Sequence, residues 1–167
     1  MDAKTLEEAI HQMLSMVMDP EINTVSILDL GMLENVLIKK YKDGYSVTIQ
    51  LLPTFLGCPA LGIMKQTILK EMECMEEIKE TTVQYLYDPP WTSDRITQKG
   101  IEGLKKFGIS PPPRMNEEDG SWQVDCPYCG SSFVTVENLF GPTACRSILY
   151  CKNCRNPFET MKPISNL

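Results

Sequence analysis

Apolar residues recur with a helical period in two segments of the first half of the chain. Over residues 3–18 they fall on one side of a helix, which is typical of a helix with one buried face. These positions are Leu6, Ile10, Met13, Leu14 and Val17. The same period returns over residues 59–77, where the apolar stripe consists of Leu61, Met64, Ile68, Met72 and Met75. Each segment is therefore predicted to be an amphipathic helix that buries its stripe.

An alternating apolar and polar period, typical of half-buried strands, lies between and after these helices. Strands are predicted over Leu33–Lys39 and Tyr45–Leu51, joined by a hairpin turn at Lys42–Gly44. A third strand is predicted over Thr81–Tyr87, after the second helix. Asp19 precedes a proline and so ends the first helix, because a residue before proline avoids helical backbone angles.

A third helix is predicted to follow, with Thr92 or Ser93 as its cap and an end near Phe107. Gly100 and Gly103 lower the helix propensity of this segment. The order helix, hairpin, helix, strand, helix predicts an α+β fold. We expect two layers, with the helices packed on one face of a single sheet.

Proline and polar residues then mark a domain boundary. Residues 110–113 read Ser-Pro-Pro-Pro, which stiffens the chain as a spacer, and residues 116–120 are polar and end in glycine. We therefore predict a first domain over residues 1–109, a linker over 110–121 and a second domain over 122–167.

Four cysteines in the second domain have the spacing of a zinc ribbon. Cys126 and Cys129 form one Cys-x-x-Cys pair, Cys151 and Cys154 form another, and residues 130–150 separate the pairs. In such a ribbon each pair lies on a tight turn, and the hairpin between them brings the turns together. Four thiolates around one zinc ion leave no open position, so the predicted role is structural. The alternative is two disulfides, which would require an oxidising compartment.

The composition limits the partners and the compartment. Of the 167 residues, 43% are hydrophobic and 23% charged, as in an ordinary globular protein. The net charge of −6 disfavours nucleic acid and anionic membranes, so neither is expected as a partner. The start at Met1 leads directly into the amphipathic pattern, so we expect no signal peptide. The seven cysteines, four of them at metal spacing, favour a reducing cytoplasm.

Cys58 is the main candidate for chemistry outside the ribbon. Pro59 suits the first turn of the second helix and would place Cys58 at its cap, where the helix dipole favours a metal-binding thiolate. Glu21 and Asp29 are predicted to line the same end of the sheet, and Thr54 lies in the same loop as the thiol. A mixed thiolate and carboxylate site of this kind would suit iron. The alternative is a buried and inert cysteine.

The remaining candidates are weaker. His11 is the only histidine and has no nucleophile near it in sequence, so a Cys-His hydrolase is poorly supported. Cys145 has three interpretations. It packs in the ribbon as a small apolar residue, which we favour; it is a free thiol that faces a partner; or it is an extra ligand if the ribbon holds an iron–sulfur cluster.

Several of these segments carry the motifs of known families. The segments of the first domain are Asp19–Ile22, Val25–Ile27, Asp29–Gly31 and Thr54–Pro59. They resemble the iron–sulfur assembly domain of eukaryotic cytosolic cluster-targeting proteins and of bacterial Suf-associated proteins. Pro89–Asp94, the four ribbon cysteines and Phe140–Cys145 are similar to one branch, the phenylacetate-degradation protein D (PaaD) family. The resemblance covers nearly the whole chain, and the combination of both domains is specific.

The resemblance implies a non-catalytic accessory protein of the multicomponent phenylacetyl-CoA ring-1,2-epoxidase. That oxygenase has a di-iron catalytic subunit and a reductase with flavin and an iron–sulfur centre. The resemblance also implies a role in maturing metal centres, with Cys58 and Glu21 at the family's cysteine and carboxylate positions. The sequence departs from the expected Trp-Thr-x-Asp-Trp pattern at its last position, where Arg95 stands.

Three functions follow as hypotheses. In the first, Cys58 holds iron or a cluster transiently, and the ribbon docks on the epoxidase subunits or on other iron–sulfur assembly proteins. A homodimer could supply a second thiolate to such a site. In the second, the chain is a permanently bound structural subunit of the oxygenase. In the third, it is an iron–sulfur electron carrier that uses the C-terminal cysteines.

Overall fold

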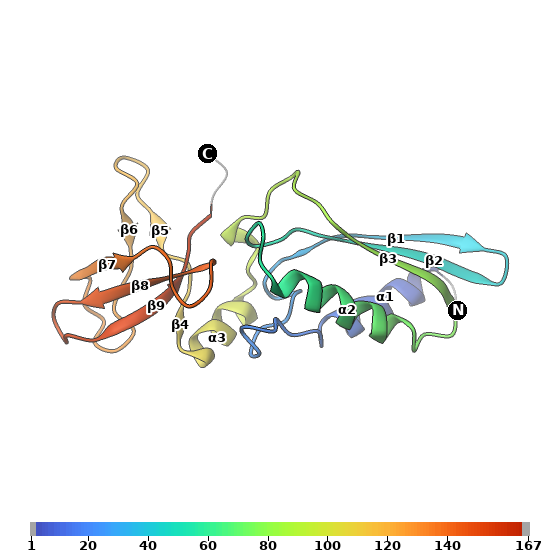
Figure 1. The fold of residues 1–167 in the computed structure, drawn as a ribbon, viewed down its shortest axis with the longest axis horizontal. Coiled ribbons are helices and arrows are strands. Elements are labelled where there is room, and N and C mark those ends of the chain that lie inside the picture. The colour runs from blue at the N-terminus through green and yellow to red at the C-terminus, as the bar shows by residue number, and fades with distance from the viewer. Residues whose placement is uncertain (1–2, 165–167) are drawn as a thin grey trace.

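The computed structural model describes residues 3–164, which form two lobes side by side along the long axis (Figure 1). The first lobe contains α1 (Ala3–Leu14), β1 (Leu33–Tyr41), β2 (Gly44–Leu51), α2 (Ala60–Met72) and β3 (Ile78–Tyr85). The strand order is β1-β2-β3, in which β1 and β2 are antiparallel and β2 and β3 are parallel. Both helices lie on one face of this sheet (Figure 1), which confirms the predicted α+β fold.

The apolar periods explain these elements. In β2, Val47, Ile49 and Leu51 point into the core and are fully buried, while the residues between them remain partly exposed. The buried stripe of α2, which includes Met64 and Ile68, packs into the same core. The α2 segment supplies the crossover that two neighbouring parallel strands require.

The helices are shorter than the sequence pattern predicts. The first helix ends at Leu14 rather than at residue 18, because the chain turns and Met18 forms a bridge with Ser26. The second helix ends at Met72 rather than at residue 77. In both cases apolar residues beyond the end still pack against the core from turns, as Val17 and Met75 do, so burial continues after the helix has stopped.

The prediction that Thr92 or Ser93 caps the third helix is wrong. Those residues open a short 3₁₀ turn, η1 (Ser93–Arg95), and α3 (Gln98–Phe107) begins after it. The α3 cap is Thr97, whose side-chain oxygen accepts a hydrogen bond from the Gly100 N–H at 3.0 Å.

The second lobe is a four-stranded sheet with a separate hairpin. Its strands are β4 (Ile109–Ser110), β5 (Arg114–Met115), β6 (Trp122–Gln123), β7 (Val134–Asn138), β8 (Arg146–Cys151) and β9 (Pro157–Met161). The sheet order is β4-β9-β8-β7, and β5 pairs with β6. Because β4 and β5 fall in or beside residues 110–121, part of the predicted linker is structured, and α3 leads directly into the second sheet.

The two lobes are in contact through side chains and backbone. Met161 at the end of β9 belongs to the core of the first lobe. The Ser93 N–H and the Ser93 hydroxyl both donate to the Ile164 carbonyl oxygen at 2.8 Å. The Arg146 guanidinium of β8 lies over the Phe107 ring at 5.9 Å. Among the described residues, no helix has the length and apolar content needed to cross a membrane.

Candidate metal sites

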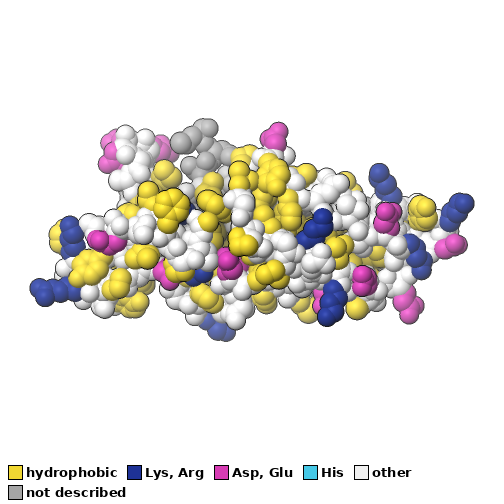
Figure 2. Space-filling view, in the orientation of Figure 1, with side chains coloured by type: hydrophobic (Ala, Val, Ile, Leu, Met, Phe, Trp, Pro, Cys, Tyr) yellow, Lys and Arg dark blue, Asp and Glu magenta, His cyan; other side chains and the backbone are white. Residues whose placement is uncertain are grey.

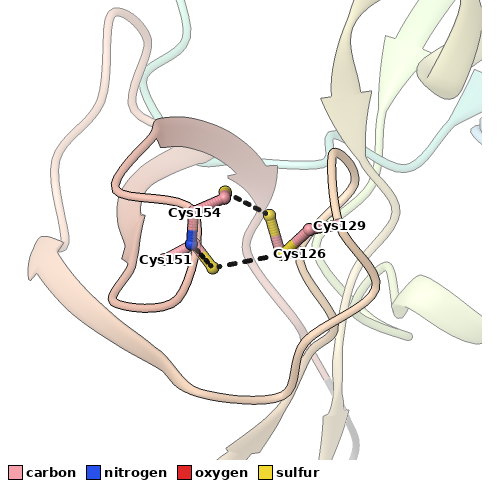
Figure 3. Close-up of side chains that lie close together, drawn as sticks. All are labelled: Cys126, Cys129, Cys151 and Cys154. Carbon is pink, nitrogen blue, oxygen red and sulfur yellow. Dashed lines mark hydrogen bonds between the residues drawn. The ribbon is translucent and has the colours of Figure 1, made fainter.

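The four ribbon cysteines converge on one point (Figure 3). Cys126 and Cys129 come from the loop between β6 and β7, whereas Cys151 ends β8 and Cys154 lies in the turn before β9. Their sulfur atoms all lie within 4.8 Å of one another. The Sγ–Sγ distance is 3.6 Å for Cys126 and Cys154 and also for Cys129 and Cys151. The closest pairs therefore join the two turns, and all four thiols are free.

These distances fit a tetrahedral metal ion. With metal–sulfur bonds of about 2.3 Å, the edge of a zinc–thiolate tetrahedron is about 3.8 Å. Backbone geometry supports the two turns, since Gly130 has φ 70° and Arg155 has φ 61°, both in the left-handed region. The site is closed by protein on all four corners, which matches a structural site.

Donor groups around the ribbon favour thiolates. The Tyr128 N–H points at the Cys126 sulfur at 3.4 Å, and the Cys154 N–H points at the Cys151 sulfur at 3.5 Å. The Asn153 amide donates to the Cys129 sulfur and lowers the pKa of that thiol to about 6. At Cys126 burial opposes this effect of the donors and raises the pKa of the thiol to about 11. Hydrogen bonds of this kind to metal-bound sulfur orient the ligands and spread their charge.

Cys58 lies in the loop between β2 and α2, beside a carboxylate. Its Sγ is 4.0 Å from Glu21 Oε2, and the residue is half-buried. Pro59, not Cys58, is the residue that caps α2, so the thiol stands one position farther from the helix than predicted. Burial and the charges of Glu21 and Asp19 raise the pKa of Cys58, although backbone N–H groups of α2 oppose the rise. The predicted lowering of this pKa is therefore wrong.

Asp19 holds Glu21 in place. The Asp19 side chain is buried, and its Oδ1 accepts hydrogen bonds from the Glu21 N–H at 2.7 Å and the Ile22 N–H at 2.9 Å. Burial raises the pKa of Asp19, while those two bonds and the charge of Arg146 counteract the rise. From the sequence, Asp19 could line the same end of the sheet as Cys58, but its role in ending the helix already explained it. Its position two residues before Glu21 was the available signal that it supports the site.

Asp29 has a different set of partners. Its carboxylate accepts hydrogen bonds from Ser26 Oγ at 2.7 Å and from Thr97 Oγ1 at 2.9 Å, and it pairs with Lys99 Nζ at 3.4 Å. These contacts tie the 22–31 loop to the start of α3. Glu21 therefore lies beside Cys58, whereas Asp29 is bonded to residues at the start of α3.

Asp29→Asn is expected to destabilise the fold by about 2 kcal/mol at neutral pH, because hydrogen bonds to a charged carboxylate are lost. Burial opposes ionisation of Asp29, but the bonds from Ser26 and Thr97 and the charge of Lys99 outweigh it and lower the pKa. A lowered pKa in the folded state gives stability that is present above the unfolded value, about 3.9, and is lost as the pH falls through the folded value.

Urea unfolding of the wild type and the variant at neutral pH and at about pH 3 measures this difference. The difference in unfolding free energy between the wild type and Asp29→Asn should be smaller at the lower pH. Glu7→Gln, at an exposed position of α1, is the control. An unchanged gap across the two pH values would show that the Asp29 charge does not stabilise the fold.

Thr54 and Arg95 occupy structural positions at the same end of the first lobe. Thr54 is buried and lines an apolar groove of about 310 Å³ with Phe55, Trp91 and other residues. Arg95 pairs with Glu34 Oε2 at 2.9 Å and donates to the Gly31 and Leu33 carbonyl oxygens at 2.7 and 2.8 Å. Arg95 stands at the position that departs from the expected motif, and its side chain bonds η1 to the residues around the start of β1.

Cys145 lies at the junction of the lobes, beside the first residue of β8. It is 9% exposed, and its Sγ is 3.2 Å from Thr143 Oγ1. Burial raises the pKa of Cys145, and the carboxylates of Asp19 and Glu21 raise it further. Cys145 is not among the four cysteines that converge in the ribbon.

Comparison with known families divides the chain into two parts that correspond to the two lobes. Residues 7–85 match the family described as iron-sulfur cluster assembly protein, and residues 110–162 match the PaaD zinc beta ribbon domain. A solved structure from Bacillus anthracis, a domain of unknown function DUF59, aligns with a TM-score of 0.53 and 25% identity. It covers 61% of this chain and 93% of its own, and supports the fold of the first lobe.

Two curated relatives extend the comparison. The Fe-S protein maturation auxiliary factor YitW of Bacillus subtilis (strain 168) is 33% identical over 96 residues, covering 57% of this chain and 89% of that protein. A protein named as a subunit of 1,2-phenylacetyl-CoA epoxidase, from Escherichia coli (strain K12), is 37% identical over 158 residues. That alignment covers 93% of this chain and 92% of the relative. With an iron–sulfur assembly domain followed by a PaaD zinc ribbon, the chain belongs to the PaaD family.

Proposed function

We propose that this protein is a non-catalytic accessory factor that helps an oxygenase of the phenylacetyl-CoA 1,2-epoxidase type acquire its iron or iron–sulfur centres. The whole-length similarity to a protein named as an epoxidase subunit and the similarity of the first lobe to Fe-S maturation factors support this proposal. The observation that carries it is the approach of Cys58 to Glu21, at 4.0 Å, on a half-buried loop of the assembly domain.

The two candidate sites suit different tasks. Four thiolates in the ribbon would enclose zinc completely and hold the second lobe together. Cys58 and Glu21 offer one sulfur and one carboxylate, a combination that suits iron and leaves open positions for a receiving protein. Metal held by few protein ligands leaves easily, and an assembly factor has to release its cargo.

We expect Cys58→Ala to abolish the increase in iron content that this protein gives its client, the catalytic subunit of the oxygenase. In cytoplasm that contains the oxygenase subunits but lacks this chain, wild-type protein should raise the iron content of the purified catalytic subunit and its phenylacetyl-CoA-dependent oxygen uptake. The variant should leave both at the level without the chain. Cys74→Ala removes an exposed thiol near the end of α2 and is the matched control. Full client iron with Cys58→Ala would overturn the proposal.

A second candidate is a permanently bound subunit of the oxygenase. Large apolar side chains exposed on the second lobe favour it, since such surfaces mark interaction sites. They are Tyr128, Phe133, Val136, Leu139 and Phe140. Figure 2 shows hydrophobic side chains over this lobe and over the junction. Co-purification of this chain with the catalytic subunits in fixed stoichiometry throughout turnover would support this candidate over a transient factor.

A further inference from the structure

The loop between β2 and α2, which carries Cys58, is fixed on the α2 side by its own lobe. The Leu61 N–H donates to the Cys58 carbonyl oxygen at 3.2 Å, and the Leu61 carbonyl oxygen accepts a hydrogen bond from Tyr85 Oη at 2.7 Å. These two bonds tie the first turn of α2 to the end of β3. Toward β2 the next residues are Leu56, which is 65% exposed, and Gly57, where an added Cβ would meet nothing within 4 Å. The tip of the loop is therefore exposed.

The end of the second lobe supports the other side of this loop. The last residue of β9, Met161, is buried in the core of the first lobe. Ile164 lines the apolar groove of about 310 Å³ together with Phe55. The Lys162 ammonium lies 5.6 Å from the centre of the Phe55 ring. The segment 161–164 therefore leads from the ribbon sheet to the β2 side of the loop.

Lys162 is itself held within the second lobe. Its N–H donates to the Cys145 carbonyl oxygen at 2.9 Å, and its ammonium lies 4.5 Å from the centre of the Phe140 ring. None of the ion pairs within residues 3–164 involves Lys162, so the rings of Phe55 and Phe140 are the groups that orient the ammonium. A cation over an aromatic face is attracted by the ring. Lys162 thus connects one loop of each lobe.

We propose that Lys162 and Ile164 are positioning residues that hold the Cys58 loop in place for metal transfer. The inference rests on the proposed function and gives the second lobe a task in it. Phe55 lies three residues before Cys58, so contacts that fix its ring limit how far the thiol can move. The second lobe thereby keeps the sulfur near Glu21, although both of those groups belong to the first lobe.

The test is the rate at which iodoacetamide alkylates Cys58 in the full-length chain with zinc in its ribbon, measured for each cysteine by peptide mass spectrometry. Lys162→Gln removes the charge but keeps the backbone N–H. The Cys58 rate should rise about fivefold to tenfold, because loss of the cation–π contacts lets the loop open more often. Lys162→Arg keeps the cation and should react like the wild type. Cys74, which is exposed, should react equally in all chains.

Lys152→Gln is the matched control. The Lys152 ammonium lies 5.3 Å from the centre of the Phe133 ring, so this variant removes the same kind of contact within the ribbon. It should leave the Cys58 rate unchanged. Ile164→Ala should raise that rate with no change of charge, and Ile164→Val replaces it if the alanine variant does not fold. An unchanged Cys58 rate in Lys162→Gln or in the Ile164 variant would overturn the role assigned to that residue.

Stability measurements separate positioning from a general weakening of the fold. Urea unfolding gives the global unfolding constant of each variant, and zinc analysis shows whether its ribbon is loaded. A local role predicts that the Cys58 rate rises much more than the global unfolding constant. A Cys58 rate that rises only in proportion to that constant would assign the effect to lost stability and overturn the proposal.

The iron content of the client separates this inference from the proposed function. Lys162→Gln should lower the increase in client iron, and Lys162→Arg should preserve it. If Lys162→Gln leaves the Cys58 rate unchanged while Cys58→Ala still abolishes the increase, the transfer role stands and the positioning role is wrong. If Cys58→Ala raises client iron fully, the transfer role fails whatever the alkylation rates show.

Discussion

Cys151→Ser is expected to release the ribbon metal and unfold the second lobe. Cys151 is fully buried, and the core of this lobe consists of Cys126, Leu149, Cys151 and Phe158 with a few partly buried neighbours. So small an apolar core cannot stabilise a lobe without a metal or disulfides. In zinc-finger peptides a structural zinc ion contributes roughly 10–16 kcal/mol to folding, and removal of one thiolate forfeits most of it.

Metal analysis and circular dichroism measure the result. The wild type should contain about one zinc per chain, as a closed four-thiolate site requires, and the variant almost none. The helical signal should persist, because α1 and α2 pack in the core of the first lobe. Cys74→Ser, the same change at an exposed cysteine, should leave zinc and unfolding unchanged. Stoichiometric zinc in Cys151→Ser would contradict the prediction.

The colour of the purified protein is a further check on the same site. Zinc–thiolate proteins are colourless, whereas a four-cysteine iron–sulfur cluster absorbs visible light. A brown protein that bleaches in Cys151→Ser would identify the ribbon as a redox centre and would favour the electron-carrier hypothesis. A colourless protein with zinc assigns the ribbon to structure alone.

The features that the sequence predicted are those that depend on short-range spacing. The two Cys-x-x-Cys pairs each form a turn, so their spacing alone indicated the cluster of four sulfurs. The alternation in β2 indicated which of its residues face the core. The metal site at Cys58 and Glu21 stays a prediction; these residues are 37 positions apart in the sequence, and 4.0 Å separates the Cys58 sulfur from Glu21 Oε2.

The features that escaped prediction depend on how distant segments pack. Cys145 was expected to pack in the ribbon as a small apolar residue; it is buried beside β8 but lies outside the apolar cluster that contains Cys126 and Cys151. The helix cap at Thr97 depends on η1, which the pattern of apolar residues does not reveal. The pKa of Cys58 was expected to fall, because the sequence indicates the nearby helix but not the burial of the thiol.

The role of the glycines in α3 also depends on packing that the sequence does not reveal. Their substitution is expected to have the second large effect on stability. The sequence treats Gly100 and Gly103 as weak helix formers. In the structure both are buried, and they allow α3 to lie directly against the backbone of the 24–29 loop. A Cβ at Gly103 would lie 2.5 Å from the Thr24 carbonyl oxygen, and one at Gly100 would collide with the Asp29 carbonyl oxygen. Thr24 Oγ1 also donates to the Gly103 carbonyl oxygen at 2.7 Å.

The double variant Gly100→Ala, Gly103→Ala is expected to destabilise the fold by roughly 3–5 kcal/mol. Alanine gains about 1 kcal/mol of helix propensity at each position. The clashes outweigh this gain, because the colliding atoms belong to the backbone and cannot rotate away. Urea unfolding of the single and double variants measures the change. Gly62→Ala in α2 is the control, since nothing lies within 4 Å of its Cβ position, and it should be stabilised.

These variants also test whether the packing of α3 positions Glu21 beside Cys58. The turn that contains Asp19 and Glu21 precedes the 24–29 loop, so a shift of α3 away from that loop should move Glu21 relative to Cys58. We therefore expect Gly103→Ala, the milder of the two clashes, to reduce the iron that the protein helps the oxygenase to acquire, while ribbon zinc stays at the wild-type level. Unchanged iron content of the oxygenase with a destabilised Gly103→Ala protein would show that the turn keeps its geometry without the close approach of α3.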